Sequence, residues 1–177
     1  MDFKSQEVTK FTDYGGLARV IRDGESSNNY DVVNYGNTGL SETVEGLSTA
    51  TLGEILEDLK SGKYYAVGAY QFKAATFEET MKAAGLGTNT KFSIDVQDRM
   101  FWARIMNSIR PNVKNYILGK SDDIDAALED IAMEFAAAPM ANGKGFYDND
   151  ERGNKAIIDL DTLRDTLKLA RKSISGK

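Results

Sequence analysis

The sequence predicts a mainly α-helical domain of the α+β class, with a small β-hairpin after the first helix. Three observations support this class. Most segments have apolar residues at helical spacing, and the 177 residues include only two prolines. One short segment, 28–36, is rich in β-branched and aromatic residues and is bounded by Asn and Gly. Because no repeat or linker interrupts the chain, residues 1–177 are expected to form a single domain.

The elements follow in chain order from apolar spacing and capping residues. The spacing around Ile21 predicts a first helix that ends near Gly24. A strand or hairpin is expected over 28–36, and the polar segment 36–48 is expected to form a loop. Asp122 is expected to cap a later helix. Further helices are expected at 48–62, 73–85, 93–109, 111–119, 121–138 and 161–173, with a long loop at 139–154.

The composition excludes several kinds of chemistry. The chain has no cysteine and no histidine, so disulfides, thiolate or imidazole metal sites and Ser-His-Asp or Cys-His catalysis are excluded. Acid–base chemistry must therefore use carboxylates, lysine or tyrosine. The net charge of −5 argues against a sequence-independent nucleic-acid binder.

The sequence contains no targeting or membrane-spanning signal. Its first residues are polar and of mixed charge, unlike a secretory signal peptide. No apolar run approaches the roughly 20 residues that a membrane span needs. We therefore expect a monomer that is made in the cytoplasm and does not insert into a membrane.

Glu25 lies where the first helix gives way to a polar loop. A solvated helix end is the commoner role for a glutamate at such a position. A partly buried carboxylic acid without a neighbouring cation, however, stays protonated and can donate its proton to a leaving oxygen. Glu25 is therefore a candidate general acid.

Two further segments are candidates for ligand binding. The segment 66–72, AVGAYQF, joins a glycine, an amide and two aromatic rings, which suit sugar recognition. The alternative is a turn in which Tyr70 and Phe72 fill the core. The loop at 139–154 carries Phe146 and Tyr147. Long polar loops of this kind are often functional, and the alternative is a mobile surface loop without a role in binding.

These segments in this order resemble the lysozyme-like superfamily, and most closely the phage lambda endolysin type of lytic transglycosylase and the phage muramidases. The resemblance covers roughly residues 16–156. The chain differs from the family over 36–48 and extends from 157 to 177 beyond the last shared segment. The residues that carry the resemblance are Glu25, YDV at 30–32, GAYQF at 68–72, FSIDVQD at 92–98, DIDAALEDI at 123–131, GKGFYDN at 143–149 and GNKA at 153–156.

The resemblance implies a two-lobed helical fold and cleavage of the β-1,4 bond between N-acetylmuramic acid and N-acetylglucosamine in peptidoglycan. Glu25 would be the acid and base, and neither a cofactor nor a metal would be needed. The residues implied in substrate binding are Ser26, Tyr30, Gly68, Tyr70, Gln71, Phe72 and Tyr147.

Two reaction outcomes remain open. In a lytic transglycosylase the muramic C6 hydroxyl attacks and leaves a 1,6-anhydro end, whereas in a muramidase water attacks with the help of a second carboxylate. Asp31, Glu42 and Glu45 are the candidates for that carboxylate. Asp31 belongs to a segment that the family shares without needing a second acid, so the anhydro-forming reaction is favoured.

The resemblance also implies partners and a place of action. The partner would be peptidoglycan glycan strands in the periplasm, reached after release or delivery by a holin or by a secretion or phage apparatus. The alternatives are a hydrolytic muramidase domain of an antibacterial effector or phage particle, and a wall-binding or structural domain without activity.

Overall fold

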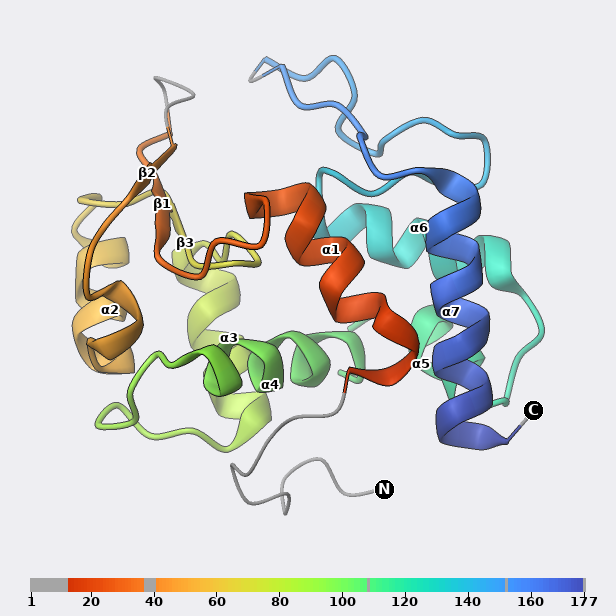
Figure 1. Ribbon diagram of the computed structural model, residues 1–177, viewed down its shortest axis with the longest axis horizontal. Helices are drawn as coiled ribbons and strands as arrows, with labels where there is room; N and C mark the ends of the chain where they lie inside the picture. Colours follow the sequence, from red (N-terminus) through yellow and green to blue (C-terminus); the bar gives the residue numbers. More distant parts are fainter. Residues whose placement is uncertain (1–12, 37–40, 108, 152, 177) are drawn as a thin grey trace. The chain divides into compact units, whose positions relative to one another are not determined.

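The computed structural model describes residues 13–36, 41–107, 109–151 and 153–176 (Figure 1). The protein is mostly helical (52%), with a small three-stranded antiparallel sheet, which confirms the expected α+β class. The described chain divides into two compact units. The first unit lies within Ser26–Arg104, and the second comprises residues 13–25 and 105–176.

The first unit contains the sheet, whose strands are ordered β2-β1-β3. The strands are β1 (Val32–Asn34), β2 (Ser41–Thr43) and β3 (Ala66–Val67). The central strand pairs Val33 with Glu42 on one side and with Val67 on the other. The strand expected within 28–36 is therefore present, but its partner β2 lies in the segment expected to be a loop. The three residues of β2 are exposed and show no alternation of apolar and polar side chains, so periodicity could not identify it.

Three α-helices and a short 3-10 helix complete the first unit. These are η2 (Leu47–Thr49), α2 (Leu52–Lys60), α3 (Ala74–Ala84) and α4 (Ile94–Ile105). Thr51 caps α2 in a reciprocal arrangement, because its hydroxyl accepts from the Glu54 N–H while the Glu54 carboxylate accepts from the Thr51 N–H. Gly85, with φ of 67°, ends α3 as expected. The helix expected over 93–109 ends earlier, at Ile105.

The second unit is built from helices. They are η1 (Tyr14–Gly16), α1 (Leu17–Ser26), α5 (Pro111–Ile117), α6 (Ile124–Glu134) and α7 (Leu160–Ser175), and in Figure 1 α7 lies beside α5 and α6. Asp13 accepts hydrogen bonds from the N–H groups of Ala18 and Arg19 at the start of α1 (2.9 and 3.0 Å). Among the described helices, none is long and apolar enough to cross a membrane.

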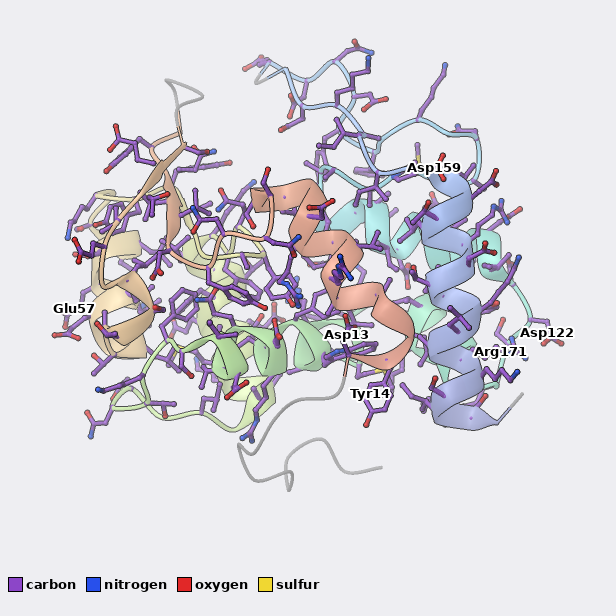
Figure 2. The ribbon with its side chains drawn as sticks, viewed as in Figure 1. Asp13, Tyr14, Glu57, Asp122, Asp159 and Arg171 are labelled. Atoms are coloured by element: carbon purple, nitrogen blue, oxygen red, sulfur yellow. The ribbon has the colours of Figure 1, made fainter. Side chains whose placement is uncertain are left out.

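The cap of α6 differs by one residue from the expected one. Asp123 accepts from the N–H of Ala126, whereas the Asp122 carboxylate forms an ion pair with Arg171 of α7 (Figure 2). Asp159 caps α7 by accepting from the N–H of Thr162. Adjacent aspartates have similar capping propensities, so only the tertiary contact with Arg171 distinguishes them.

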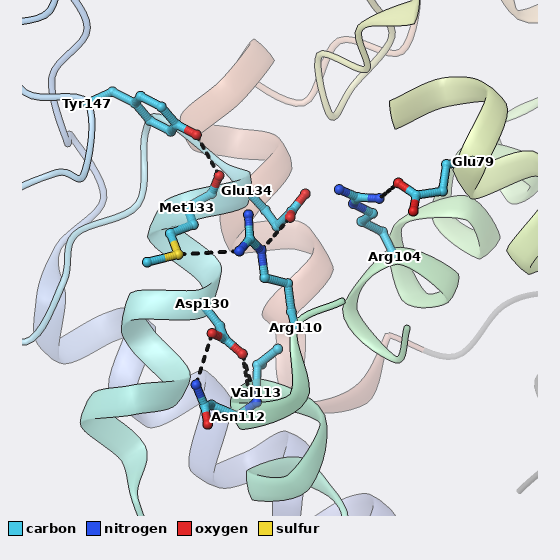
Figure 3. Close-up of polar contacts among 9 residues, drawn as sticks. All are labelled: Glu79, Arg104, Arg110, Asn112, Val113, Asp130, Met133, Glu134 and Tyr147. Carbon is cyan, nitrogen blue, oxygen red and sulfur yellow. Dashed lines mark hydrogen bonds and ion pairs between the residues drawn. The ribbon is translucent and has the colours of Figure 1, made fainter. Parts of the chain in front are cut away.

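Asp130 of α6 is buried and holds the N-terminus of α5 (Figure 3). Its Oδ2 accepts from the N–H groups of Asn112 (2.8 Å) and Val113 (3.1 Å), and its Oδ1 accepts from Nδ2 of Asn112 (3.1 Å). Asp130→Ala is expected to lower the free energy of unfolding by about 2–4 kcal/mol, because it removes three hydrogen bonds and leaves the buried N–H of Val113 without its acceptor. Urea denaturation measures this, with Glu129→Ala on the exposed face of α6 as the control. Equal effects of the two changes would contradict the prediction.

Candidate functional site

Glu25 lies in the last turn of α1, and its side chain is half-buried. Its Oε1 accepts a hydrogen bond of 2.9 Å from the backbone N–H of Ala137, a residue 112 positions later in the chain. Ala137 lies in the turn that follows α6. A backbone donor has no side-chain rotamers, so it constrains the carboxylate more tightly than a long side chain would. The candidate acid is thus held in a defined position within the second unit.

The first helix ends near Gly24, as expected, but the glycine itself lies inside the helix. α1 continues through Ser26. A Cβ at Gly24 would lie 2.6 Å from Cγ1 of Ile158 and 3.0 Å from Cβ of Ala137. Gly24 is therefore required by the close approach of two other segments to the helix, and not by a left-handed helix end.

The last turn of α6 is linked to the loop that carries Tyr147 (Figure 3). Arg110 forms an ion pair with Glu134 (Nε to Oε1, 2.6 Å), and its Nη1 lies 3.3 Å from the sulfur of Met133. The hydroxyl of Tyr147 donates to the carbonyl of Met133 at 2.7 Å. Since a backbone carbonyl holds this hydroxyl, the ring of Tyr147 is the part available to a ligand.

Phe146 and Tyr147 form an aromatic pair in this loop. Their ring centroids are 5.1 Å apart and nearly perpendicular, and the residues are 45% and 37% exposed. Exposed aromatic rings on an ordered loop can pack against the apolar faces of sugars. The sequence singled out Tyr147 for sugar binding, and the structure adds the more exposed Phe146 beside it.

Asp148 closes the same loop. Hydrogen bonds from the backbone N–H groups of Ala156 and Gly145 hold the pKa of this carboxyl below its ordinary value of 3.8. Because the pKa is lower in the folded protein, ionised Asp148 stabilises the loop above about pH 3.8, and this stabilisation is lost as the pH falls through the folded value. We expect the Ala156 amide proton signal to shift in an NMR titration between about pH 6 and 2. Asp148→Asn should abolish this transition, and its persistence would show that another group causes it.

The turn at Gly68–Gln71 is a tight hairpin in the first unit. Reciprocal backbone hydrogen bonds of 3.0 Å between Val67 and Phe72 close it. Gly68 has φ of 73°, and a Cβ there would lie 2.4 Å from Oε1 of Gln97. Gln71 has φ of 51°, which is uncommon for this residue, and its Nε2 donates to the carbonyl of Gly68 (2.9 Å). A strained polar residue held in this way is a candidate functional residue.

The aromatic residues of this hairpin are in the core. Tyr70 is buried and stacks on Phe101 with ring centroids 4.7 Å apart, and its hydroxyl donates to Oδ1 of Asp98 at 2.6 Å. Phe72 is also buried and packs edge-on against Phe77. The rings of Tyr70 and Phe72 therefore fill the core of the unit in this structure, which is the alternative that the sequence left open, and they offer no exposed face to a sugar.

Two α4 residues that sequence reasoning did not single out organise the hairpin. Gln97 donates from Nε2 to the carbonyls of Tyr30 and Phe92, and its Oε1 accepts from the N–H of Ala69. Asp98 accepts from the hydroxyl of Tyr30 at 2.9 Å, in addition to that of Tyr70. Tyr30, an expected sugar-binding residue, is thus fixed at both its hydroxyl and its backbone. The adjacent polar residues Gln97 and Asp98, on a helix otherwise rich in apolar residues, were the feature of the sequence that could have indicated this role.

The candidates for a second carboxylate all lie in the first unit, as does Ser26. Asp31 accepts from the N–H of Ser48 at 2.7 Å and so holds η2. Glu42 lies on exposed β2, where it accepts from the hydroxyl of Tyr35 (3.4 Å), and Glu45 lies in the exposed turn that follows. Asp31 therefore has a clear role in the loop structure, and the two glutamates are surface residues.

Of the sequence-predicted candidates, the second unit thus holds Glu25 as a positioned carboxylate, and the first holds the strained polar turn Gly68–Gln71. Within the part of the chain that the structure describes, no group of three or more acidic side chains could hold a metal ion. Comparison of the chain with protein-family models, with curated proteins and with solved structures finds no match in any of the three.

Proposed function

We propose that the protein cleaves the β-1,4 bond between N-acetylmuramic acid and N-acetylglucosamine in peptidoglycan, with a lysozyme-like fold and Glu25 as the general acid. The observation that carries the proposal is the hydrogen bond between Glu25 and the Ala137 N–H, which orients the carboxyl group at the end of α1. An acid that protonates a glycosidic oxygen must be held in position, because misplacement by even about 1 Å costs much of the rate.

The chemistry follows from the composition. Because the chain has neither histidine nor cysteine, a carboxylic acid is the group best suited to donate a proton to a leaving oxygen. Glu25 transfers its proton to the glycosidic oxygen as the C1–O bond breaks, and positive charge develops at C1 of the muramic acid. The N-acetylglucosamine then leaves with a free 4-hydroxyl group.

We further propose that the reaction ends by internal transfer. The C6 hydroxyl of the muramic acid attacks C1 and gives its proton to Glu25, which restores the acid and leaves a 1,6-anhydro ring. Support comes from the three carboxylates that could assist water in the alternative, hydrolytic reaction. Asp31 is engaged with the N–H of Ser48, and Glu42 and Glu45 are exposed. A second carboxylate that directs water would have to be ordered near the reacting carbon.

The proposal extends to substrate contacts and to delivery. In the second unit we propose the rings of Phe146 and Tyr147 for sugar contact, and in the first unit the side chains of Ser26 and Gln71. The substrate lies in the periplasm, so the protein would reach it after release through a holin or delivery by a secretion or phage apparatus.

Mass spectrometry of the fragments released from purified peptidoglycan tests the proposal. Anhydro-muramic ends are the expected result. Reducing muramic ends would mean hydrolysis and would require one of the three candidate carboxylates to assist water. Binding to peptidoglycan without release of fragments would overturn the enzymatic proposal and leave a wall-binding or structural domain.

A further inference from the structure

The residue that holds Glu25 is itself held by the segment that leads into α7. The Ala137 N–H donates to Oε1 of Glu25 at 2.9 Å. The Ala137 carbonyl accepts from the N–H groups of both Ile157 and Ile158, each at 3.0 Å. Ala137 is buried, so both of its backbone groups depend on these partners. The position of the donor to Glu25 therefore depends on the backbone N–H groups of positions 157 and 158, and not on the exposed side chain of Ile157.

The same segment also contacts α1 directly. A Cβ at Gly24 would lie 2.6 and 2.8 Å from Cγ1 and Cδ1 of Ile158, and 3.0 Å from Cβ of Ala137. The Ile158 side chain therefore packs against the helix backbone one residue before Glu25. Gly24 permits this approach, since any larger residue would displace Ile158, Ala137 or the helix.

α7 fixes this segment in turn. Asp159 follows Ile158 directly and caps the helix by accepting from the Thr162 N–H at 2.8 Å. Leu163 and Leu167 of α7 are buried in the unit. These residues belong to the 157–177 extension, where the sequence continues beyond the segments that resemble phage endolysins. A rigid helix joined to Ile158 through its own cap leaves the segment little freedom to move.

We propose that Ile158 is a positioning residue for Glu25, acting through Gly24 and Ala137, so that the C-terminal extension is part of the catalytic apparatus. This inference rests on the proposed function of Glu25. Ile158 itself touches no reacting atom. It keeps α1 and the Ala137 turn at the separation that the hydrogen bond to Glu25 requires.

A pair of compensating substitutions tests this role. Gly24→Ala is expected to lower kcat for glycan release by about tenfold or more with little change in KM, because the added methyl group pushes Ile158 and Ala137 away. Ile158→Ala removes the two atoms that the methyl group would meet. The double variant Gly24→Ala/Ile158→Ala is therefore expected to recover most of the kcat that Gly24→Ala loses.

Thermal stability separates positioning from folding. Helix propensity alone predicts that Gly24→Ala raises Tm, since alanine is the better helix former. A fall in kcat without a matching fall in Tm supports the proposal. The proposal is overturned if kcat and Tm fall together in Gly24→Ala, Ile158→Ala and the double variant. It is also overturned if kcat of the double variant is no higher than that of Gly24→Ala. Ile157→Ala is the matched control, because its side chain is 68% exposed while its backbone hydrogen bond is retained.

A second measurement does not depend on activity. The NMR signal of the Ala137 amide proton reports its hydrogen bond to Glu25, and Glu25→Gln gives the reference shift for an amide acceptor at this position. We expect Gly24→Ala to move this signal and the double variant to restore it, with no effect from Ile157→Ala. If the wild-type protein releases no glycan fragments, the proposed function fails, while the amide signal still decides whether Ile158 positions Glu25. An amide signal unchanged in Gly24→Ala and in Ile158→Ala overturns the positioning role even in an active enzyme.

Discussion

Replacing Glu25 by glutamine is expected to lower the rate of glycan cleavage by about 10²–10⁴-fold, the usual contribution of a general acid. The glutamine Oε1 can still accept from the Ala137 N–H, which is 2.9 Å from the native carboxylate. An amide, however, cannot give a proton to the leaving oxygen. We therefore expect the fold and the binding of peptidoglycan to persist while turnover is lost. The rate of release of soluble fragments measures the first effect, and co-sedimentation with peptidoglycan measures the second.

Asp23→Asn is the matched control for this prediction. Asp23 is an exposed carboxylate on the same helix, two residues before Glu25. Asp23→Asn makes the same carboxyl-to-amide change but should leave the rate within about twofold of wild type. Glu25→Asp is expected to give an intermediate rate, because the shorter side chain keeps the acid but withdraws it from the substrate. Full activity of Glu25→Gln would exclude Glu25 as the acid, and an equal loss in Asp23→Asn would point to a general effect of charge.

The second large effect is expected for stability, at Gln97. Its side chain is 0% exposed and makes three hydrogen bonds, one with the N–H of Ala69 (2.9 Å) and one with each of the carbonyls of Tyr30 and Phe92 (3.1 Å). Leucine has a similar size, but Gln97→Leu leaves the Ala69 N–H and the Phe92 carbonyl buried without this partner and removes the part-buried bond to the Tyr30 carbonyl. Each such group costs about 1–3 kcal/mol, so we expect the free energy of unfolding to fall by about 3–5 kcal/mol.

The single tryptophan provides the measurement for Gln97→Leu. Trp102 is buried next to Phe101 in the same unit, so its fluorescence during denaturation with guanidinium reports the unfolding of that unit. Asp95→Leu introduces the same apolar side chain at an exposed position of α4 and should change the stability by about 1 kcal/mol or less. A denaturation midpoint for Gln97→Leu close to that of Asp95→Leu would show that the three hydrogen bonds contribute little.

The sequence by itself determined the helical elements and the limits on the chemistry. The apolar spacing that predicts α2, α6 and α7 involves residues within about four positions of one another, so it can be recognised without knowledge of the fold. Helix ends were predicted less well, as at Ile105, because neighbouring turns have similar energies. The absence of histidine and cysteine is a property of the composition alone, and it restricts acid–base chemistry to carboxylates, lysine and tyrosine.

Tertiary structure alone decided how the candidate residues are used. The sequence predicted that the first helix ends near Gly24, but only the structure shows that this glycine makes room for Ile158. Tyr70 could face a ligand or fill the core, and only its packing on Phe101 and its bond to Asp98 decide between the two. The backbone N–H that donates to Glu25 belongs to a residue 112 positions further along the chain. Local periodicity carries no information about such contacts, because they depend on which distant segments the folded core brings together.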